Sequence, residues 1–240
     1  MPDVRRLVAA ASDLVWPVLC AGCGSPEARW CAECAAFLAG PARPTAPTPC
    51  PPGLPPAWTT ARYDGPVRRA IVTWKEEERR DLTHPLAAAL ALAVDAALVA
   101  CAPARAGPNG GAVLLVPVPS RSAARRARGA DPVRDLAVRA AEIVRATGQS
   151  VRVLAALAHR REVADQAGLG AEARARNMSG ALRVRAGASA RVVGRSCLLI
   201  DDIVTTGATL VAAADALRAA GAHPFGVAVV AATARAEGGG

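Results

Sequence analysis

From residue 57 onward, short apolar runs of strand length alternate with longer Ala-rich stretches of helical composition. The apolar runs predict strands at 58–63, 112–118, 151–157, 196–201 and 225–232, with a short further strand at 182–185. The longer stretches predict helices at 67–74, 85–101, 132–147 and 207–220, the last two closed by Gly148 and Gly221. This alternation predicts an α/β fold with a mainly parallel sheet flanked by helices.

The chain divides into three zones of different composition. Residues 1–40 contain four of the seven cysteines, and residues 41–56 contain eight of the 19 prolines. Because proline fixes φ and lacks a backbone N–H, the second zone excludes a helix or a central strand and predicts a semi-rigid linker. We therefore expect a cysteine-rich module at 1–40, a linker at 41–56 and an α/β domain at 57–237.

The overall composition excludes a disordered chain. Of 240 residues, 52% are hydrophobic and 20% are charged, so the chain has enough apolar surface to offset the entropy lost on folding. Aromatic residues make up only 3% of the chain, and Ala, Val and Leu must therefore build the core.

No membrane span is expected. The longest apolar stretch, 86–102, is interrupted by Asp95 and is shorter than the roughly 18 to 20 apolar residues that cross a bilayer. Near the N-terminus, Arg5 and Arg6 precede an apolar run as in a signal peptide, but Asp13 interrupts that run early. We therefore predict a cytoplasmic protein, whose cysteines serve as metal ligands or buried thiols rather than as disulfides.

The charge balance favours anionic partners. The formal net charge is +9, and Lys75 is the only lysine among 29 basic residues. An excess of this size attracts phosphates and nucleic acids. A general preference of this chain for arginine over lysine would explain the net charge and the single lysine equally well. The charge alone therefore does not identify a ligand.

The most informative segment is the apolar run of residues 197–200 and the polar residues that follow it. Two acids, Asp201 and Asp202, come at the end of the predicted strand, and a Thr- and Gly-rich loop then opens a helix. The first N–H groups of a helix are unpaired and carry a partial positive charge, which suits a phosphate, and Gly207 lets the backbone approach it closely. The carboxylates suit sugar hydroxyls or a cation. The chain lacks the Gly-Lys-Ser/Thr of a nucleotide-hydrolase phosphate loop.

This segment resembles the 5-phosphoribosyl-1-pyrophosphate (PRPP) motif of type I phosphoribosyltransferases. The resemblance implies that Asp201 and Asp202 are the catalytic-site acids and hold the ribose hydroxyls. It implies that Thr205, Thr206, Gly207, Ala208 and Thr209 bind the 5-phosphate, with Mg²⁺ accompanying PRPP. It also implies a pyrophosphate loop after the strand at 112–118, formed by Val118, Pro119, Ser120 and Arg121.

Cysteines near the N-terminus form two Cys-x-x-Cys pairs: Cys20 with Cys23, and Cys31 with Cys34. Four thiolates at this spacing can converge tetrahedrally on one zinc ion. A redox dithiol is the alternative, although a single pair at a strand–helix junction would then be expected. Because so small a module has almost no core of its own, metal ligation would supply most of its folding free energy.

The order of these features is similar to that of the ComF family, phosphoribosyltransferase-like proteins associated with bacterial competence and DNA uptake. The matching features are the Cys20–Cys34 module, Tyr63 and Gly65 leading to Lys75, Val116–Pro119, Arg128–Gly129, Gln166 with Arg174–Asn177, and Leu198–Leu210. By this resemblance the α/β domain has a hood at about 57–110 and a core at about 111–237. The chain departs from the family pattern at residues 130–132, and a second cysteine cluster is reduced to Cys50.

Further basic residues are candidates for phosphate or flap contacts. Arg121, Arg125, Arg126 and Arg128 follow the predicted strand end within eight residues, and guanidinium groups bind phosphate oxygens bidentately. Lys75 is a further candidate for a phosphate. The alternatives are a solvated basic loop for the arginines and surface salt bridges with Glu76–Glu78 for Lys75.

Two functions fit these patterns. The first is a Mg²⁺-dependent enzyme that transfers phosphoribose from PRPP to an unknown acceptor and releases pyrophosphate, a reaction that needs no side-chain nucleophile. The second is a non-catalytic factor in DNA uptake that binds PRPP and single-stranded DNA and docks competence proteins.

Overall fold

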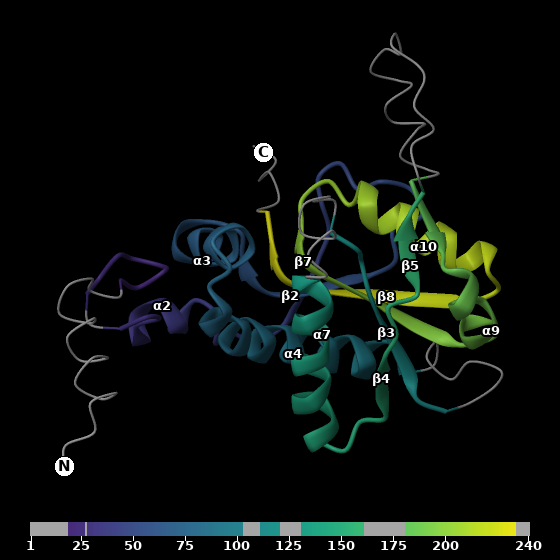
Figure 1. Ribbon diagram of the computed structural model, residues 1–240, viewed down its shortest axis with the longest axis horizontal. Coiled ribbons are helices and arrows are strands. Elements are labelled where there is room, and N and C mark those ends of the chain that lie inside the picture. The colour runs from purple at the N-terminus through teal and green to yellow at the C-terminus, as the bar shows by residue number, and fades with distance from the viewer. Residues whose placement is uncertain (1–18, 27, 103–110, 121–130, 161–180, 234–240) are drawn as a thin grey trace, which may run out of the picture.

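A six-stranded sheet forms the centre of the molecule (Figure 1). The structure, a computed structural model, describes residues 19–26, 28–102, 111–120, 131–160 and 181–233. The strand order is β1-β2-β8-β7-β3-β4, and every neighbouring pair is parallel except β1 and β2. These strands are β1 (Arg43–Thr45), β2 (Ala57–Arg62), β3 (Val113–Pro117), β4 (Val151–Val153), β7 (Ser196–Val204) and β8 (His223–Ala232). The predicted mainly parallel α/β sheet is therefore confirmed.

Helices cover both faces of this sheet (Figure 1). The helices are α2 (Ala32–Ala36), α3 (Gly65–Glu76), α4 (Thr83–Ala100), α7 (Pro132–Ala146), α9 (Ser189–Val192) and α10 (Ala208–Ala219), with 3-10 turns at Arg80–Leu82 and Ala186–Ala188. On one face, α4 packs against α7, β2 and β8. On the other face, α10 packs against β7, β8 and a separate antiparallel ribbon of β5 (Leu157–His159) and β6 (Leu182–Val184).

Alternation along the buried strands divides the core into two parts. Leu198 and Ile200 of β7 join the cluster under α4 and α7, whereas Cys197 and Leu199 join the cluster under α10. Successive side chains of a strand point to opposite faces, so one continuous apolar run serves both layers. This explains why residues 196–200 are apolar or small at every position.

One helical segment, Arg80–Ala100, is long and apolar enough to cross a membrane by length and composition. More than half of its most apolar stretch is buried, 56% of it, and Leu90, Val94 and Leu98 are completely inaccessible. Because α4 packs against α7, β2 and β8, its apolar character is that of a core helix, as predicted for residues 86–102.

Two predicted strands differ from those observed. The run at 151–157 divides into β4 and β5, because the chain turns at residues 154–156, where the Ala156 N–H donates to the Leu154 carbonyl at 2.7 Å. The chain thereby leaves the main sheet and enters the ribbon. Strand β7 is three residues longer than predicted, since Ile203 and Val204 continue to pair with β8. The two aspartates consequently lie within the strand.

The Pro-rich segment at 41–56 packs on the domain. It contains β1, which pairs antiparallel with β2, and Arg43 Nη1 donates to the Thr60 carbonyl at 3.2 Å. Pro44 is tolerated in β1 because an edge strand has one side without ladder hydrogen bonds. The chain then passes close to the start of α10, where Pro47 and Pro51 lie near Gly207.

Candidate functional site

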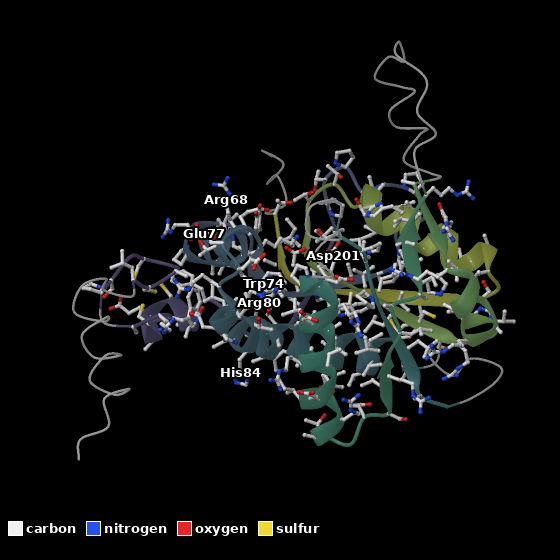
Figure 2. All side chains as sticks on the ribbon, in the orientation of Figure 1. Arg68, Trp74, Glu77, Arg80, His84 and Asp201 are labelled. Carbon is white, nitrogen blue, oxygen red and sulfur yellow. The ribbon has the colours of Figure 1, made fainter. Side chains whose placement is uncertain are left out.

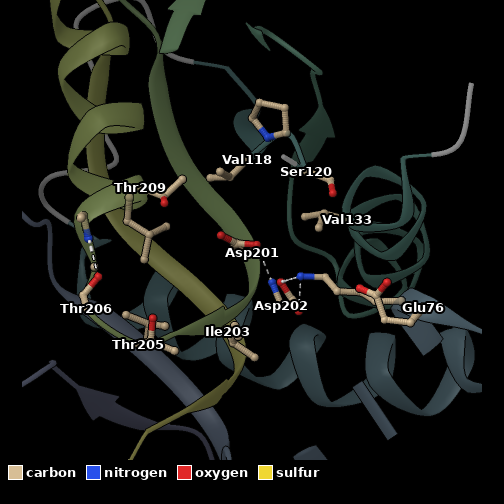
Figure 3. Close-up of a pocket in the computed structure, with 16 residues that line it drawn as sticks. Glu76, Val118, Ser120, Val133, Asp201, Asp202, Ile203, Thr205, Thr206 and Thr209 are labelled. Atoms are coloured by element: carbon tan, nitrogen blue, oxygen red, sulfur yellow. Dashed lines mark hydrogen bonds and ion pairs between the residues drawn. The ribbon is translucent and has the colours of Figure 1, made fainter. Parts of the chain in front are cut away.

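A pocket of about 320 Å³ lies at the carboxyl ends of the parallel strands (Figure 3). Strands β2, β3, β7 and β8 all end at this edge, and the chain after β2 continues into α3, which borders the pocket. Its lining comprises Lys75, Glu76, Val118–Ser120, Val133 and Asp201–Leu210. Ligands in open α/β sheets bind outside the carboxyl ends of the strands, so the position suits a binding site.

The two aspartates of β7 have different surroundings. Asp202 is buried, with a side chain only 1% exposed, and both of its carboxylate oxygens lie close to Lys75 Nζ, at 2.7 Å for Oδ1 and 2.6 Å for Oδ2. Asp201 points to the other side of the strand and lies along the pocket wall (Figure 3). Lys75 is 23% exposed. Both aspartates line the pocket, and the ion pair with Lys75 fixes the carboxylate of Asp202.

The pairing of Lys75 with Asp202 joins residues 127 positions apart in the chain. The sequence left two partners open for this lysine, a phosphate or the neighbouring residues Glu76–Glu78. The structure places it on the buried acid Asp202, because α3 follows directly after β2 at the edge of the sheet. No local pattern around residue 75 signals this contact.

The pKa of the Asp201 carboxyl lies well above its ordinary value. Burial disfavours the charged form most strongly, and the neighbouring carboxylate of Asp202 raises the pKa further. Lys75 and the backbone N–H of Asp202, which donates to Asp201 Oδ1 at 2.9 Å, act in the opposite direction. A ligand that brings a cation or hydroxyl donors to this carboxyl would favour its ionised form.

We expect Asp201→Asn to stabilise the ligand-free protein near neutral pH, by on the order of 1 kcal/mol. A carboxyl whose folded pKa is raised binds more protons folded than unfolded, so wild-type stability falls as pH rises above the ordinary value of 3.8. The gain should shrink as pH falls towards 4, where the wild-type carboxyl is protonated in the folded state and partly protonated in the unfolded state. Denaturant unfolding between pH 4 and 8 measures it. Asp215→Asn, at an exposed position of α10, is the control; an equal gain there would contradict the explanation.

The loop between β7 and α10 has the geometry of an anion site. Gly207 precedes α10 with φ +75°, a conformation that glycine adopts without a Cβ penalty. Thr205 and Thr206 are exposed at the pocket, and the Ala208 N–H points to Thr206 Oγ1 at 3.5 Å (Figure 3). A helix of 12 residues begins here, and its first N–H groups have no carbonyl partner within the helix.

Three apolar side chains of the Pro-rich segment pack against this loop at Gly207. A Cβ placed on Gly207 would lie 3.2 Å from Leu54 Cδ2, 3.2 Å from Pro51 Cγ and 3.3 Å from Pro47 Cγ. Arg218 of α10 also donates to the Gly53 carbonyl at 3.1 Å. The segment therefore restrains the loop position, a role that its Pro-rich sequence does not reveal.

The end of β3 forms the opposite wall. The Val118 N–H donates to the Ile200 carbonyl at 2.9 Å, which holds Val118 beside the strand that carries the aspartates. His159 Nε2 lies 3.0 Å from the Pro119 carbonyl; since a carbonyl only accepts, the ring nitrogen donates. In the sequence, His159 is followed by two arginines and belongs to no motif. Only the fold therefore reveals this contact.

Several candidate residues lie outside the described part of the chain. These are Arg121, Arg125, Arg126, Arg128, Gln166 and Arg174–Asn177. The described residues Val118, Pro119, Ser120, Lys75 and 201–209 all border the one pocket.

The four cysteines of the N-terminal module come together. The Sγ atoms of Cys20, Cys23, Cys31 and Cys34 all lie within 4.8 Å of one another. Cys31 Sγ is 3.6 Å from Cys20 Sγ and 3.6 Å from Cys23 Sγ, close to the roughly 3.8 Å between thiolates bound tetrahedrally at Zn–S distances of about 2.3 Å. The four thiols can therefore hold one zinc ion.

Backbone groups favour a thiolate in this cluster. Although burial disfavours the charge on Cys20, N–H groups of Cys23, Cys31 and Gly22 outweigh it and lower the pKa of its thiol to about 6. Gly22 leaves no room for a side chain, because a Cβ there would lie 2.5 Å from Cys34 Sγ. The cluster also contacts the domain, since Arg69 of α3 donates to the Gly22 carbonyl and Arg79 to the Arg29 carbonyl.

Residues 136–238 match the family model of the phosphoribosyl transferase domain. The chain carries a phosphoribosyl transferase domain. The match includes β7, the loop at residues 205–207 and α10, all of which contribute to the pocket. It begins within α7, so the cysteine cluster, the Pro-rich segment and Lys75 lie outside it. Among curated proteins, none matches the chain.

Proposed function

We propose that the phosphoribosyl transferase domain binds PRPP with Mg²⁺ in this pocket and transfers its phosphoribosyl group to an acceptor, with release of pyrophosphate. The observation that carries the proposal is the position of Asp201 and Asp202 beside the first turn of α10 in one pocket. Carboxylates suit ribose hydroxyls, and an open helix N-terminus suits a phosphate. A phosphoribosyl group carries both the hydroxyls and the phosphate in one ligand.

The residues then have distinct roles. The loop from Thr205 to Thr209 binds the 5-phosphate through hydroxyls and backbone N–H groups. Asp201 accepts hydrogen bonds from the ribose hydroxyls, and Asp202 holds Lys75 at the pocket rim. Val118, Pro119 and Ser120 face the pyrophosphate, where bound Mg²⁺ would neutralise charge on the leaving group. The proposed pocket supplies position and charge, which is what breaking the anomeric bond requires.

We propose a structural zinc ion for the cysteine cluster. The four thiols lie at near-tetrahedral spacing, and no His, Asp or Glu of the described residues belongs to the same group, which favours a closed zinc site over a redox pair. A cytoplasmic location goes with this proposal, because zinc-binding thiols must stay reduced.

The combination of a four-cysteine cluster with a phosphoribosyl transferase domain supports a ComF-type protein. Binding of single-stranded DNA and of competence proteins stays a prediction from the sequence, since the basic residues 121–128 lie outside the described chain.

Calorimetric titration of PRPP with Mg²⁺ tests the proposal. We expect saturable binding that weakens at least 100-fold in the Asp201→Asn/Asp202→Asn variant, because charged hydrogen bonds contribute about 1.5–3 kcal/mol each. Asp215→Asn, on the exposed side of α10 and paired with Arg218, is the matched control and should bind as the wild type does. Equal binding by all three proteins would contradict the proposed site.

Pyrophosphate release then separates an enzyme from a binding factor. In the presence of PRPP and a panel of purine, pyrimidine and amine acceptors, an enzyme releases pyrophosphate with at least one of them. If the protein binds PRPP but releases no pyrophosphate with any acceptor, PRPP binding stands and the proposed transfer activity is refuted.

A further inference from the structure

A second cavity, of about 370 Å³, lies away from the PRPP pocket, towards the amino-terminal halves of β3 and β7. Its lining comprises Leu114, Arg152, Leu154, Ala190, Arg191, Val193 and Arg195. None of these residues borders the first pocket. In Figure 2, side-chain nitrogen atoms gather on this side of the molecule, between α9 and the end of β4.

The cavity lies at the β4 edge of the sheet. Arg152 of the edge strand β4 pairs in register with Leu114, which in turn pairs with Cys197 of β7. Leu114 and Cys197 belong to the core under α10. Arg152 therefore lies in line with Leu114 and Cys197 across the sheet, on the face that α10 covers. The short helix α9, only four residues long, lies nearest and leaves Val193 54% exposed.

The lining is strongly positive. It contains three arginines and no acid. Within the described part of the chain, none of the three forms a salt bridge, whereas Arg139 and Arg218 on other surfaces do. Arg195 is held in place by a hydrogen bond from Nη2 to the Ala112 carbonyl at 2.6 Å. Three like charges around one cavity repel one another, and an anion placed between them relieves this repulsion.

The chemistry of the lining points to a phosphate ester. Guanidinium groups bind phosphate oxygens through paired hydrogen bonds. Leu114 and Leu154 are nearly buried and form an apolar part of the wall, which suits a flat apolar group attached to the phosphate. The volume lies within the range of small-molecule sites. We propose that this cavity, which we call the arginine pocket, binds a nucleotide-sized phosphate ester independently of the PRPP site.

Calorimetric titration with adenosine 3′-monophosphate, which lacks the 5-phosphate that the PRPP pocket is proposed to bind, and with inorganic phosphate tests the arginine pocket. At low salt we expect wild-type protein to bind the nucleotide more tightly than inorganic phosphate. Arg152→Ala and Arg191→Ala should each weaken nucleotide binding about ten-fold or more, since each removes a charge-assisted contact. Arg139→Ala, an exposed arginine of α7, is the control for lost charge and should leave binding unchanged.

Two results would overturn the proposal. The first is nucleotide binding that is absent, or that Arg152→Ala and Arg191→Ala do not change although circular dichroism shows both variants folded. The second is equal affinity for nucleotide and inorganic phosphate, which would leave no role for the apolar wall. Titration of PRPP into the same variants keeps the two proposals apart, because the arginine variants should retain the PRPP binding that Asp201→Asn/Asp202→Asn loses.

Discussion

Removal of metal by a strong chelator at neutral pH is expected to unfold the cysteine module while the phosphoribosyl transferase domain stays folded. Among the described residues of 19–40, the buried apolar side chains are Cys20, Cys34 and Leu38, and two of these are the proposed ligands. So small a core does not stabilise a fold alone. Structural zinc contributes about 10–16 kcal/mol in small zinc-binding peptides, so loss of the ion should remove most of the module's stability.

Hydrogen exchange measured by mass spectrometry reports the change directly. Amides of residues 19–40 should lose protection on chelation, while β7 and β8 keep theirs. Cys34→Ser should bind zinc weakly or not at all, and Cys50→Ser, at an exposed cysteine outside the cluster, should retain one zinc per chain. Unchanged protection of the module after complete metal removal would refute a structural zinc ion.

Gly207→Ala is expected to destabilise the protein by about 2–5 kcal/mol and to weaken PRPP binding at least ten-fold. An alanine at φ +75° costs about 1–2 kcal/mol. Its Cβ would also press on Leu54, Pro51 and Pro47 at 3.2–3.3 Å, and overpacking of this kind costs about 1–3 kcal/mol. Two of the three neighbours are rigid prolines, so we expect the loop itself to move and to misplace its N–H groups.

Gly221→Ala is a close control for this prediction. Gly221 has φ +76°, almost the same as Gly207, but a Cβ there meets only Val193, at 3.7 Å, an ordinary contact distance. The Gly221→Ala variant should therefore lose only the stability that an alanine at positive φ costs, and it should bind PRPP as the wild type does. Chemical unfolding and PRPP titration of both variants measure the difference. Equal losses of stability in the two variants would mean that the Pro-rich segment does not restrain the loop.

Sequence alone predicts the site best where it is built from consecutive residues. Asp201, Asp202 and the loop to Thr209 follow one another along a strand, a turn and a helix, so local patterns place them. Strand β7 is predicted because both of its faces are buried, which makes its apolar residues continuous. The observed strand still runs past the aspartates, since pairing with β8 extends it.

Contacts between distant segments are what the sequence does not predict. The ion pair between Lys75 and Asp202, the contact of His159 with Pro119, and the packing of Leu54 on Gly207 all depend on tertiary structure. The two aspartates look equivalent in the chain. Their side chains nevertheless face opposite sides of the strand, and only Asp202 is thereby placed against Lys75.

The short strand β1 has a consequence for the solubility of the domain. It covers the outer edge of β2 with three residues, the central one a proline. An uncovered β2 would present a row of free N–H and C=O groups to other molecules, a common route to self-association. A chain shortened to begin at residue 57 would lose this protection together with the support of the loop at Gly207. The segment that joins module and domain thus also keeps neighbouring molecules apart.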